Sequence, residues 1–242
     1  MSLSGKRILI VGGGSGIGYA VAEGAAKEGA DVIVASTNSE RVQSAAARLG
    51  NHASAAQVDV TDEASVAALF DGLTNLDHIV TTAGDWGGPR RGPLADLDLD
   101  AAQRLFAVRF WGAVRLAKHG AAKLNQGGSI TFTDGMVAHR PSKGSAISTA
   151  MAGSIEHLTR ALAVELSPLR VNCVCPGLIR TDVWNSIPEE GREARFTEMT
   201  KRQLVPRIGE AAECAEAYLY LLKAGYTTGQ VLHVEGGVAL GG

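Results

Sequence analysis

The sequence predicts a single α/β domain in which a doubly wound parallel sheet of about seven strands carries helices on both faces. Three observations lead to this fold class. Short apolar runs alternate with helical segments from one end of the chain to the other. The length of 242 residues suits one large α/β domain better than two small ones. The first apolar run, Ile8–Val11, passes directly into a glycine-rich turn. Strands that look buried on both faces are typical of parallel sheets.

The turn reads V-G-G-G-S-G-I-G over Val11–Gly18 and predicts a nucleotide-binding loop. Gly12 lets the chain turn sharply, Gly16 lets the backbone approach a pyrophosphate, and Gly18 lets the next helix pack closely on the sheet. The amino-terminal end of that helix then offers N–H groups to phosphate. The spacing G-x-x-x-G-x-G differs from the commoner G-x-G-x-x-G, and a purely structural turn is the alternative.

The other elements follow from the same alternation. Strands are expected at 31–35, 53–58, 76–80, 129–133, 171–175 and 230–234. Further helices are expected at 39–49, 62–72, 100–124, 145–166 and 210–222, with Asn38 or Ser39 capping the first of these. Residues 85–98 are rich in Gly, Pro and Asp and predict a loop. Residues 178–208 have a mixed, polar composition, which predicts a mobile substrate lid. The whole chain, residues 1–242, is expected to form one domain.

Ligands of open parallel sheets bind beyond the carboxyl ends of the strands. The residues that follow these ends are therefore expected to share one rim: Gly12–Gly18, Ser36, Asp59, Thr82–Gly84, Asp134 and Pro176–Thr181.

Composition narrows the range of partners. The net charge of -2 gives no reason to expect nucleic acid or an anionic membrane surface. No apolar run reaches membrane-spanning length, and the start M-S-L-S-G-K-R has no hydrophobic signal core, so we expect a cytoplasmic protein.

Cysteine and histidine usage points to no metal site. Cys173 and Cys175 are two apart in an expected strand and share a face, and Cys214 lies on a late helix, so reduced, packed thiols are expected. The six histidines form no H-E-x-x-H motif and no Cys/His cluster.

Together these motifs resemble the short-chain dehydrogenase/reductase family over nearly the whole chain. The matching segments are V-G-G-G-S-G-I-G, D-V after the third strand, T-T-A-G, L-T-R-A-L-A-V-E-L, R-V-N-C-V-C-P-G-L-I-R-T and T-G-Q-V-L-H-V-E-G-G. The resemblance implies a Rossmann fold, an NAD(P) cofactor, and a small carbonyl or alcohol substrate. It also implies a homo-oligomer, a tetramer in which the two long central helices pair across a two-fold axis and the C-terminal strand and tail form a second contact.

The resemblance assigns cofactor contacts residue by residue. Asp59 matches the acid that contacts adenine, although a turn-capping role is its alternative. Ala83 and Gly84 border the cofactor, and Thr181 reaches the nicotinamide amide. The full expected set is Gly12, Gly14, Ser15, Gly16, Ile17, Gly18, Ser36, Thr37, Arg41, Asp59, Val60, Ala83, Gly84, Pro176, Gly177 and Thr181.

The end of the second strand favours NADP over NAD. NAD-specific sites carry an acid there that bonds the ribose 2′-hydroxyl, whereas an arginine accommodates the 2′-phosphate. Ala35–Asn38 contains no carboxylate, Ser36 and Thr37 can donate to a phosphate, and Arg41 follows one helical turn on. Simple capping of the helix is the alternative.

The resemblance ends at the catalytic positions. The family's Asn, Ser, Tyr and Lys fall on Arg109, Gly135, Ser148 and Ala152. The stretch His139–Lys143 imitates the Tyr–Lys pair, but it is misplaced relative to L-T-R-A-L, and Pro141 disfavours helix there.

The substituted residues leave the chemistry open. Asp134, Arg109, His139 and Ser148 are the candidate catalytic residues, because an Asp–Arg–His group can bind an acidic substrate or move protons. A structural ion pair between Asp134 and Arg109, with His139 and Lys143 in solvent, is the alternative. Three functions remain: an oxidoreductase with a rebuilt proton-transfer site, a lyase or isomerase that uses these residues, and a cofactor-binding sensor or partner protein without catalysis.

Overall fold

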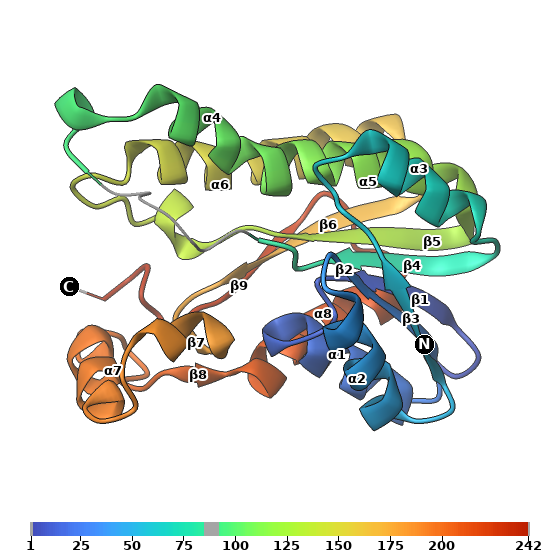
Figure 1. Cartoon of the computed structure of the whole chain (residues 1–242), viewed down its shortest axis with the longest axis horizontal. Helices are drawn as coiled ribbons and strands as arrows, with labels where there is room; N and C mark the ends of the chain where they lie inside the picture. Colours follow the sequence, from blue (N-terminus) through green and yellow to red (C-terminus); the bar gives the residue numbers. More distant parts are fainter. Residues whose placement is uncertain (1, 85–91, 242) are drawn as a thin grey trace.

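The computed structural model describes residues 2–84 and 92–241, which build one parallel sheet of seven strands (Figure 1). The strand order is β3-β2-β1-β4-β5-β6-β9, and every neighbouring pair is parallel. The strands are β1 (Arg7–Val11), β2 (Asp31–Ser36), β3 (Ala53–Gln57), β4 (Leu76–Thr81), β5 (Leu124–Thr133), β6 (Arg170–Pro176) and β9 (Val231–Val234). This arrangement confirms the predicted fold class.

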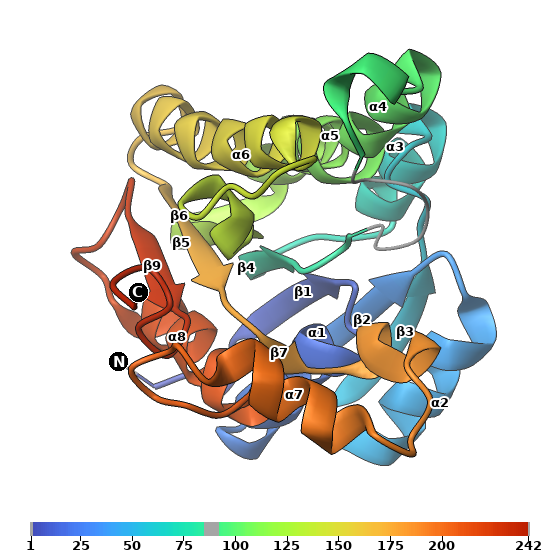
Figure 2. The same ribbon diagram turned by 90° about the vertical axis from the view of Figure 1, so that its left-hand side faces the viewer.

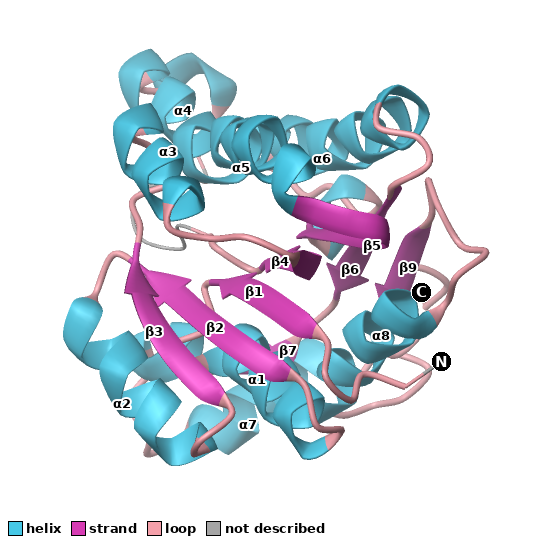
Figure 3. Cartoon of the chain, turned by 90° about the vertical axis from the view of Figure 1, so that its right-hand side faces the viewer, coloured by secondary structure: helices cyan, strands magenta, loops and turns pink. Residues whose placement is uncertain are grey.

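Helices cover both faces of the sheet (Figures 2 and 3). One layer contains α3 (Glu63–Asp71), α4 (Leu99–Phe106), α5 (Gly112–Gly120) and α6 (Ala146–Glu165). The opposite layer contains α1 (Gly16–Lys27), α2 (Ser39–Leu49) and α8 (Ala211–Lys223). Asn38 caps α2, because its side chain accepts a hydrogen bond from the Arg41 N–H.

The alternation of side chains along each strand divides the core into two clusters. On β1, Ile8 and Ile10 pack into the cluster under α1 and α8, whereas Leu9 and Val11 pack into the cluster under the other helices. All four side chains are buried. Burial of a side chain of this size contributes roughly 1.5–3 kcal/mol, so both faces of the central strand stabilise the sheet.

The structure corrects the expected continuous helix over residues 100–124. A π-helical turn, Ala107–Trp111, separates α4 from α5, and α5 ends at Gly120. A short 3-10 turn follows, and Leu124 then begins β5, where it pairs with Leu76 and packs against the core. Burial of Leu124 beside the sheet therefore outweighs the helical pattern of the sequence, and β5 is longer than the expected strand 129–133.

The polar segment 178–208 is more regular than its composition suggests. It contains β7 (Ile179–Arg180), a 3-10 turn and α7 (Arg192–Thr200), and β7 pairs with β8 (Gly209–Glu210). Arg180 fastens the unit, because its guanidinium bonds the carboxylates of Glu193 and Glu210. In the expected loop 85–98, residues 85–91 lie outside the described residues, and a 3-10 turn covers Leu94–Asp96.

No helix within the described ranges has both the length and the apolar character that crossing a membrane requires.

Candidate active site

The glycine turn adopts the geometry that its sequence predicts. Gly12 has a φ of +87°, a conformation that residues other than glycine rarely adopt. A Cβ atom on Gly18 would lie 2.3 Å from the carbonyl oxygen of Gly12 and 2.4 Å from Oγ1 of Thr82. Only glycine permits this contact between α1 and the strand ends. The amino-terminal end of α1 therefore opens onto the rim of the sheet.

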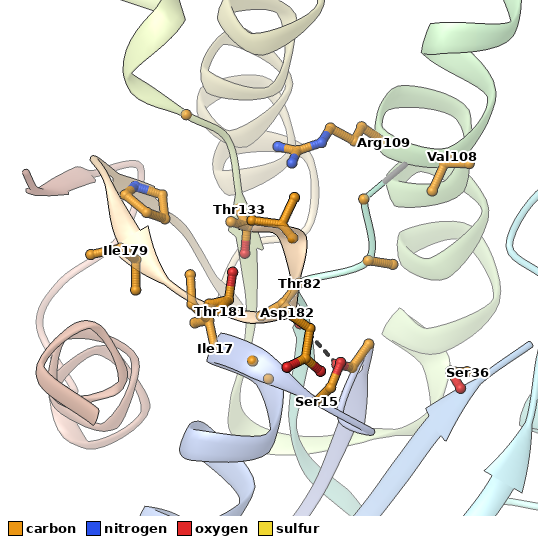
Figure 4. Close-up of a pocket in the computed structure, with 18 of the residues that line it drawn as sticks. Ser15, Ile17, Ser36, Thr82, Val108, Arg109, Thr133, Ile179, Thr181 and Asp182 are labelled. Atoms are coloured by element: carbon orange, nitrogen blue, oxygen red, sulfur yellow. Dashed lines mark hydrogen bonds between the residues drawn. The ribbon is translucent and has the colours of Figure 1, made fainter. Parts of the chain in front are cut away.

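A pocket of about 920 Å³ lies along this rim. Its walls come from the loops after β1, β2, β3, β4, β5 and β6 and from the turn after β7. All of the expected cofactor residues line it: Gly12, Gly14, Ser15, Gly16, Ile17, Gly18, Ser36, Thr37, Arg41, Asp59, Val60, Ala83, Gly84, Pro176, Gly177 and Thr181. In Figure 4, Arg109 lies on one side of the pocket, and Ser15 and Thr181 lie on the other.

The pocket fits a dinucleotide. At Gly16, where φ is +53°, an added Cβ atom would come within 3.3 Å of the Thr181 side chain, so the absence of a side chain keeps the space between α1 and β7 open. The amino-terminal end of α1 lines this space, and the first N–H groups of a helix are available to a pyrophosphate. The cradle depends on glycines at Gly12, Gly16 and Gly18 and therefore satisfies the steric demands of the cofactor.

The end of the pocket at β2 has the composition of a phosphate site. Ser36, Thr37 and Arg41 line it, and the Arg41 side chain passes beside Gly14, where an added Cβ atom would be 3.1 Å from Cγ of Arg41. Asn38 caps α2 and also lines the pocket, and the Ser36 hydroxyl pairs with the main chain of Asn38. A cation and hydroxyl groups in this position suit an anionic group such as a 2′-phosphate.

Asp59 has the structural role that was its alternative, and it also lines the pocket. Its Oδ1 accepts hydrogen bonds from the backbone N–H and the hydroxyl of Thr61, at 2.8 and 2.7 Å. The turn before α3 therefore fixes this exposed carboxylate at the wall where the resemblance places adenine.

Arg109 dominates the opposite end of the pocket. It sits in the π-helical turn between α4 and α5, and such turns often occur at functional sites. Its Nη1 donates to the main-chain carbonyl of Asp134 at 2.9 Å, and an added Cβ atom on Gly84 would lie 2.7 Å from Nη2. Arg109 is only 6 % exposed, so a permanent positive charge is held between the ends of β4 and β5.

The other family positions present no charged group to the pocket. Gly135 lines the wall, and an added Cβ atom there would meet nothing within 4 Å. Ser148 and Ala152 lie on α6, Ala152 is buried, and neither residue lines the pocket within the described part of the chain. Of the four positions where the family has Asn, Ser, Tyr and Lys, only Arg109 therefore brings a charge to this site.

The Asp134 carboxyl group lies behind the wall rather than in the pocket. It is 1 % exposed, and both carboxyl oxygens are enclosed beside the side chains of Glu156 and Cys175. Burial, together with the neighbouring Glu156, raises the pKa of Asp134 to about 8. Asp134 contributes its main chain to the site, where its carbonyl holds Arg109.

His139 and Lys143 lie away from the pocket. The His139 imidazole pairs with the Glu156 carboxylate on α6, and neither residue lines the pocket. Lys143 is exposed in the turn before α6. Sequence reasoning missed Glu156, although the helical period offered a signal. Glu156 shares the buried face of α6 with Met151, Ala152 and Ile155, and an acid at such a position calls for a partner.

Comparisons with known proteins agree with this geometry. Residues 12–239 match the family model described as enoyl-(acyl carrier protein) reductase. The chain is 34 % identical to the short-chain dehydrogenase/reductase fsr5 of Gibberella fujikuroi, over 98 % of this chain and 96 % of the relative. It is also 34 % identical to the short-chain dehydrogenase/reductase malC of Malbranchea aurantiaca, with the same coverage.

Solved structures extend the likeness to the backbone. A small-chain dehydrogenase in complex with NADPH is 34 % identical and superposes with a TM-score of 0.83, over 98 % of this chain and all of the other. The MalC reductase/Diels-Alderase from Malbranchea aurantiaca is 33 % identical with a TM-score of 0.89, over 97 % and 96 % of the two chains.

Proposed function

The chain belongs to the short-chain dehydrogenase/reductase family of NAD(P)-binding oxidoreductases, and from that premise we propose that it is an NADP(H)-dependent reductase whose reaction site is rebuilt around Arg109. The observation that carries the proposal is the placement of this guanidinium. It is buried in the pocket wall, beside Gly84 and on the carbonyl of Asp134, where the family has a neutral amide. Ser36, Thr37 and Arg41 support the choice of NADP.

Arg109 stabilises negative charge that develops on the substrate. A nicotinamide held in this pocket would supply a hydride, and negative charge would then develop on the acceptor carbonyl oxygen. Ala152 has no charge, Gly135 has no side chain, and a serine hydroxyl such as that of Ser148 is too weak an acid to replace tyrosine. A preorganised, poorly solvated cation lowers the energy of such an oxyanion. Arginine keeps its own proton, so the proton that neutralises the product comes from water.

A fixed cation also selects the substrate. The planar guanidinium binds carboxylate and phosphate groups through two parallel hydrogen bonds. We therefore propose a small substrate that carries an anionic group near its reacting carbonyl. Asp134 acts in this account as a positioning residue, because its main-chain carbonyl accepts from Nη1 of Arg109.

The test is NADPH consumption against matched panels of neutral ketones, aldehydes and carbonyl compounds that bear a carboxylate or a phosphate. We expect neutral substrates to turn over at well below about 1 per second, the low end for ordinary enzymes, and anionic substrates to be faster. Arg109→Met should lower kcat/KM for the anionic substrates at least about 100-fold, which is typical when one electrostatic group is lost. NADPH affinity should change little.

Arg104→Met is the matched control. Arg104 lies on the preceding helix α4, is exposed, and does not line the pocket. This variant should keep the activity of the native protein. Robust turnover of neutral ketones, or equal losses in the two variants, would contradict the role of Arg109. Arg109→Lys retains the charge but cannot donate the two parallel hydrogen bonds of a guanidinium, so it should give an intermediate rate.

A second candidate is a transformation without net redox change. It is favoured by the likeness to the MalC protein, whose structure is described as that of a reductase/Diels-Alderase, and by the loss of the family's proton-transfer groups from the pocket. Product that forms in the presence of NADPH while NADPH absorbance stays constant would favour this candidate over the reductase.

We also propose that the chain forms a homotetramer and that the segment 178–208 closes over the bound substrate. Small residues on α6 support the first proposal: Ala146 and Ala150 are exposed and Gly153 is half-buried, so a second helix can approach closely. Thr181, Trp184 and Ile187 line the pocket from the segment 178–208, which supports the second.

A further inference from the structure

We propose that His139, Glu156, Cys175 and His233 form a binding site for a divalent zinc-class ion, separate from the cofactor pocket. One ligand atom from each residue lies within 4.8 Å of those from the other three. The residues come from four segments: the turn after β5, α6, β6 and β9. None of them lines the cofactor pocket.

The donor set suits zinc. Two imidazoles, a thiolate and a carboxylate are all common zinc ligands, and four ligands complete a tetrahedral site. Bond lengths of about 2.0–2.3 Å place tetrahedral ligand atoms roughly 3.3–3.8 Å apart. The observed spread of up to 4.8 Å therefore requires side-chain shifts of about 1 Å or less. Magnesium and calcium prefer an oxygen-only set, so sulfur and nitrogen donors disfavour them.

The buried carboxyl group of Asp134 borders the cluster. Both of its oxygens are enclosed, and Glu156 and Cys175 are its side-chain neighbours. Two adjacent buried acids are costly unless they share a proton or a positive charge lies beside them. An ion bound by Glu156 and Cys175 supplies such a charge next to Asp134.

The known contacts of the cluster explain only part of it. His139 pairs with Glu156, which also lies 3.4 Å from Nη2 of Arg160. This pairing does not account for His233, whose ring centroid is 4.4 Å from that of His139. Nor does it account for the position of Cys175. The Cys175 thiol contacts the Met136 sulfur at 3.5 Å, and it lies within 4.8 Å of a ligand atom of each of the other three residues. A bound ion, coordinated by all four side chains, accounts for the position of each.

The surface position of the histidines gives the ion a route in. His139 and His233 are exposed, whereas Glu156 and Cys175 are buried. Binding replaces the thiol proton of Cys175 by the metal, and the proton passes to solvent, as for other thiolate sites. The sequence indicated no metal site because the four ligands are far apart in the chain and form no spaced motif.

Cobalt titration of the metal-stripped protein tests the site. Co²⁺ is the probe, because a thiolate ligand gives an intense charge-transfer band and tetrahedral coordination gives strong visible bands. We expect both, with one equivalent bound and displaced by Zn²⁺. Zinc should also raise the Tm of the native protein. His233→Ala should weaken cobalt binding at least about tenfold, and Cys175→Ser should remove the charge-transfer band.

Cys214→Ser is the matched control, because Cys214 is another buried, free thiol but lies on α8 outside the cluster. It should keep the full cobalt spectrum. His233 is exposed, so His233→Ala is expected to fold, and circular dichroism checks this for each variant. The absence of a charge-transfer band at millimolar cobalt, or a band that survives Cys175→Ser, would overturn the proposal.

Discussion

At the scale of single residues, the cofactor pocket depends most on Gly18. A Cβ atom at this position would overlap the Gly12 carbonyl and the Thr82 hydroxyl, at 2.3 and 2.4 Å. Gly18→Val should therefore separate α1 from β1, displace the N–H groups that face the phosphates, and abolish NADPH binding. Titration calorimetry measures the loss.

Gly135→Ala provides the comparison for Gly18→Val. Gly135 also lines the pocket, but a Cβ atom there points into open space. This variant should bind NADPH about as tightly as the native protein. Undiminished NADPH binding by Gly18→Val would show that the close helix–strand contact is not required.

Residue-level prediction from the sequence was uneven for a physical reason. The residues that line the cofactor pocket lie at the ends of strands, where the backbone geometry places them. Glycines and hydroxyl residues identify these strand ends in the sequence. Every position expected on that basis lines one pocket, although their contacts with NADP remain predictions. The direction of the Asp134 side chain and its neighbour Glu156 depend on how α6 packs against β5 and β6, which no local motif records.

At the scale of elements, β4 and β5 are joined by a buried polar pair that makes folding sensitive to acid. His78 on β4 lies 2.9 Å from the Ser129 hydroxyl on β5, through its Nδ1. Burial, with a smaller contribution from Arg170, lowers the pKa of His78 to about 4. The unfolded chain therefore binds more protons than the folded one between about pH 6.5 and 4.

The contribution of His78 to stability is therefore fully present above about pH 6.5 and is lost as the pH drops toward 4, with roughly 3 kcal/mol as its largest value. His78→Gln should remove this part of the pH dependence, measured as the free energy of unfolding by urea across that range. Identical slopes for His78→Gln and the native protein would contradict this assignment.

The elements themselves were largely predictable, except where the backbone leaves the regular helix. Apolar periodicity predicted each strand of the main sheet and all the helices that cover it. It did not predict the π-helical turn Ala107–Trp111, because an i→i+5 turn has no distinct composition. That turn holds Arg109, so the unpredicted part of the element is the part that positions the charge in the site.

At the scale of the whole molecule, we expect a homotetramer. Outside the small-residue stripe of α6, the same helical layer exposes Val164 at 80 % and Trp111 at 51 %. Apolar side chains of this kind on a monomer surface suggest a contact between subunits. Light scattering at micromolar concentration should give four times the chain mass of 25.1 kDa. Gly153→Arg should reduce the assembly, because an added side chain there projects outward from α6.

Lys123→Arg is a suitable control for that variant, since Lys123 lies in the 3-10 turn after α5 and already carries a charge. It should leave the mass unchanged. A monomeric mass for the native protein would rule out the proposed assembly.

Overall topology was the most predictable property of this chain, because βα alternation and right-handed crossovers permit few arrangements. Assembly depends on surfaces, which the sequence pattern constrains only weakly.

Titration calorimetry with NADPH, NADP, NADH and NAD measures whether this pocket binds a nicotinamide dinucleotide phosphate. We expect NADPH to bind more tightly than NADH. Arg41→Ala should weaken NADPH binding roughly 10- to 100-fold, the worth of a charge-assisted hydrogen bond, while NADH binding is unchanged. Arg48→Ala, on the same helix but stacked on Tyr19 outside the pocket, should have no effect on either. No binding of any form at millimolar concentration, or tighter binding of NADH than of NADPH, would contradict the account.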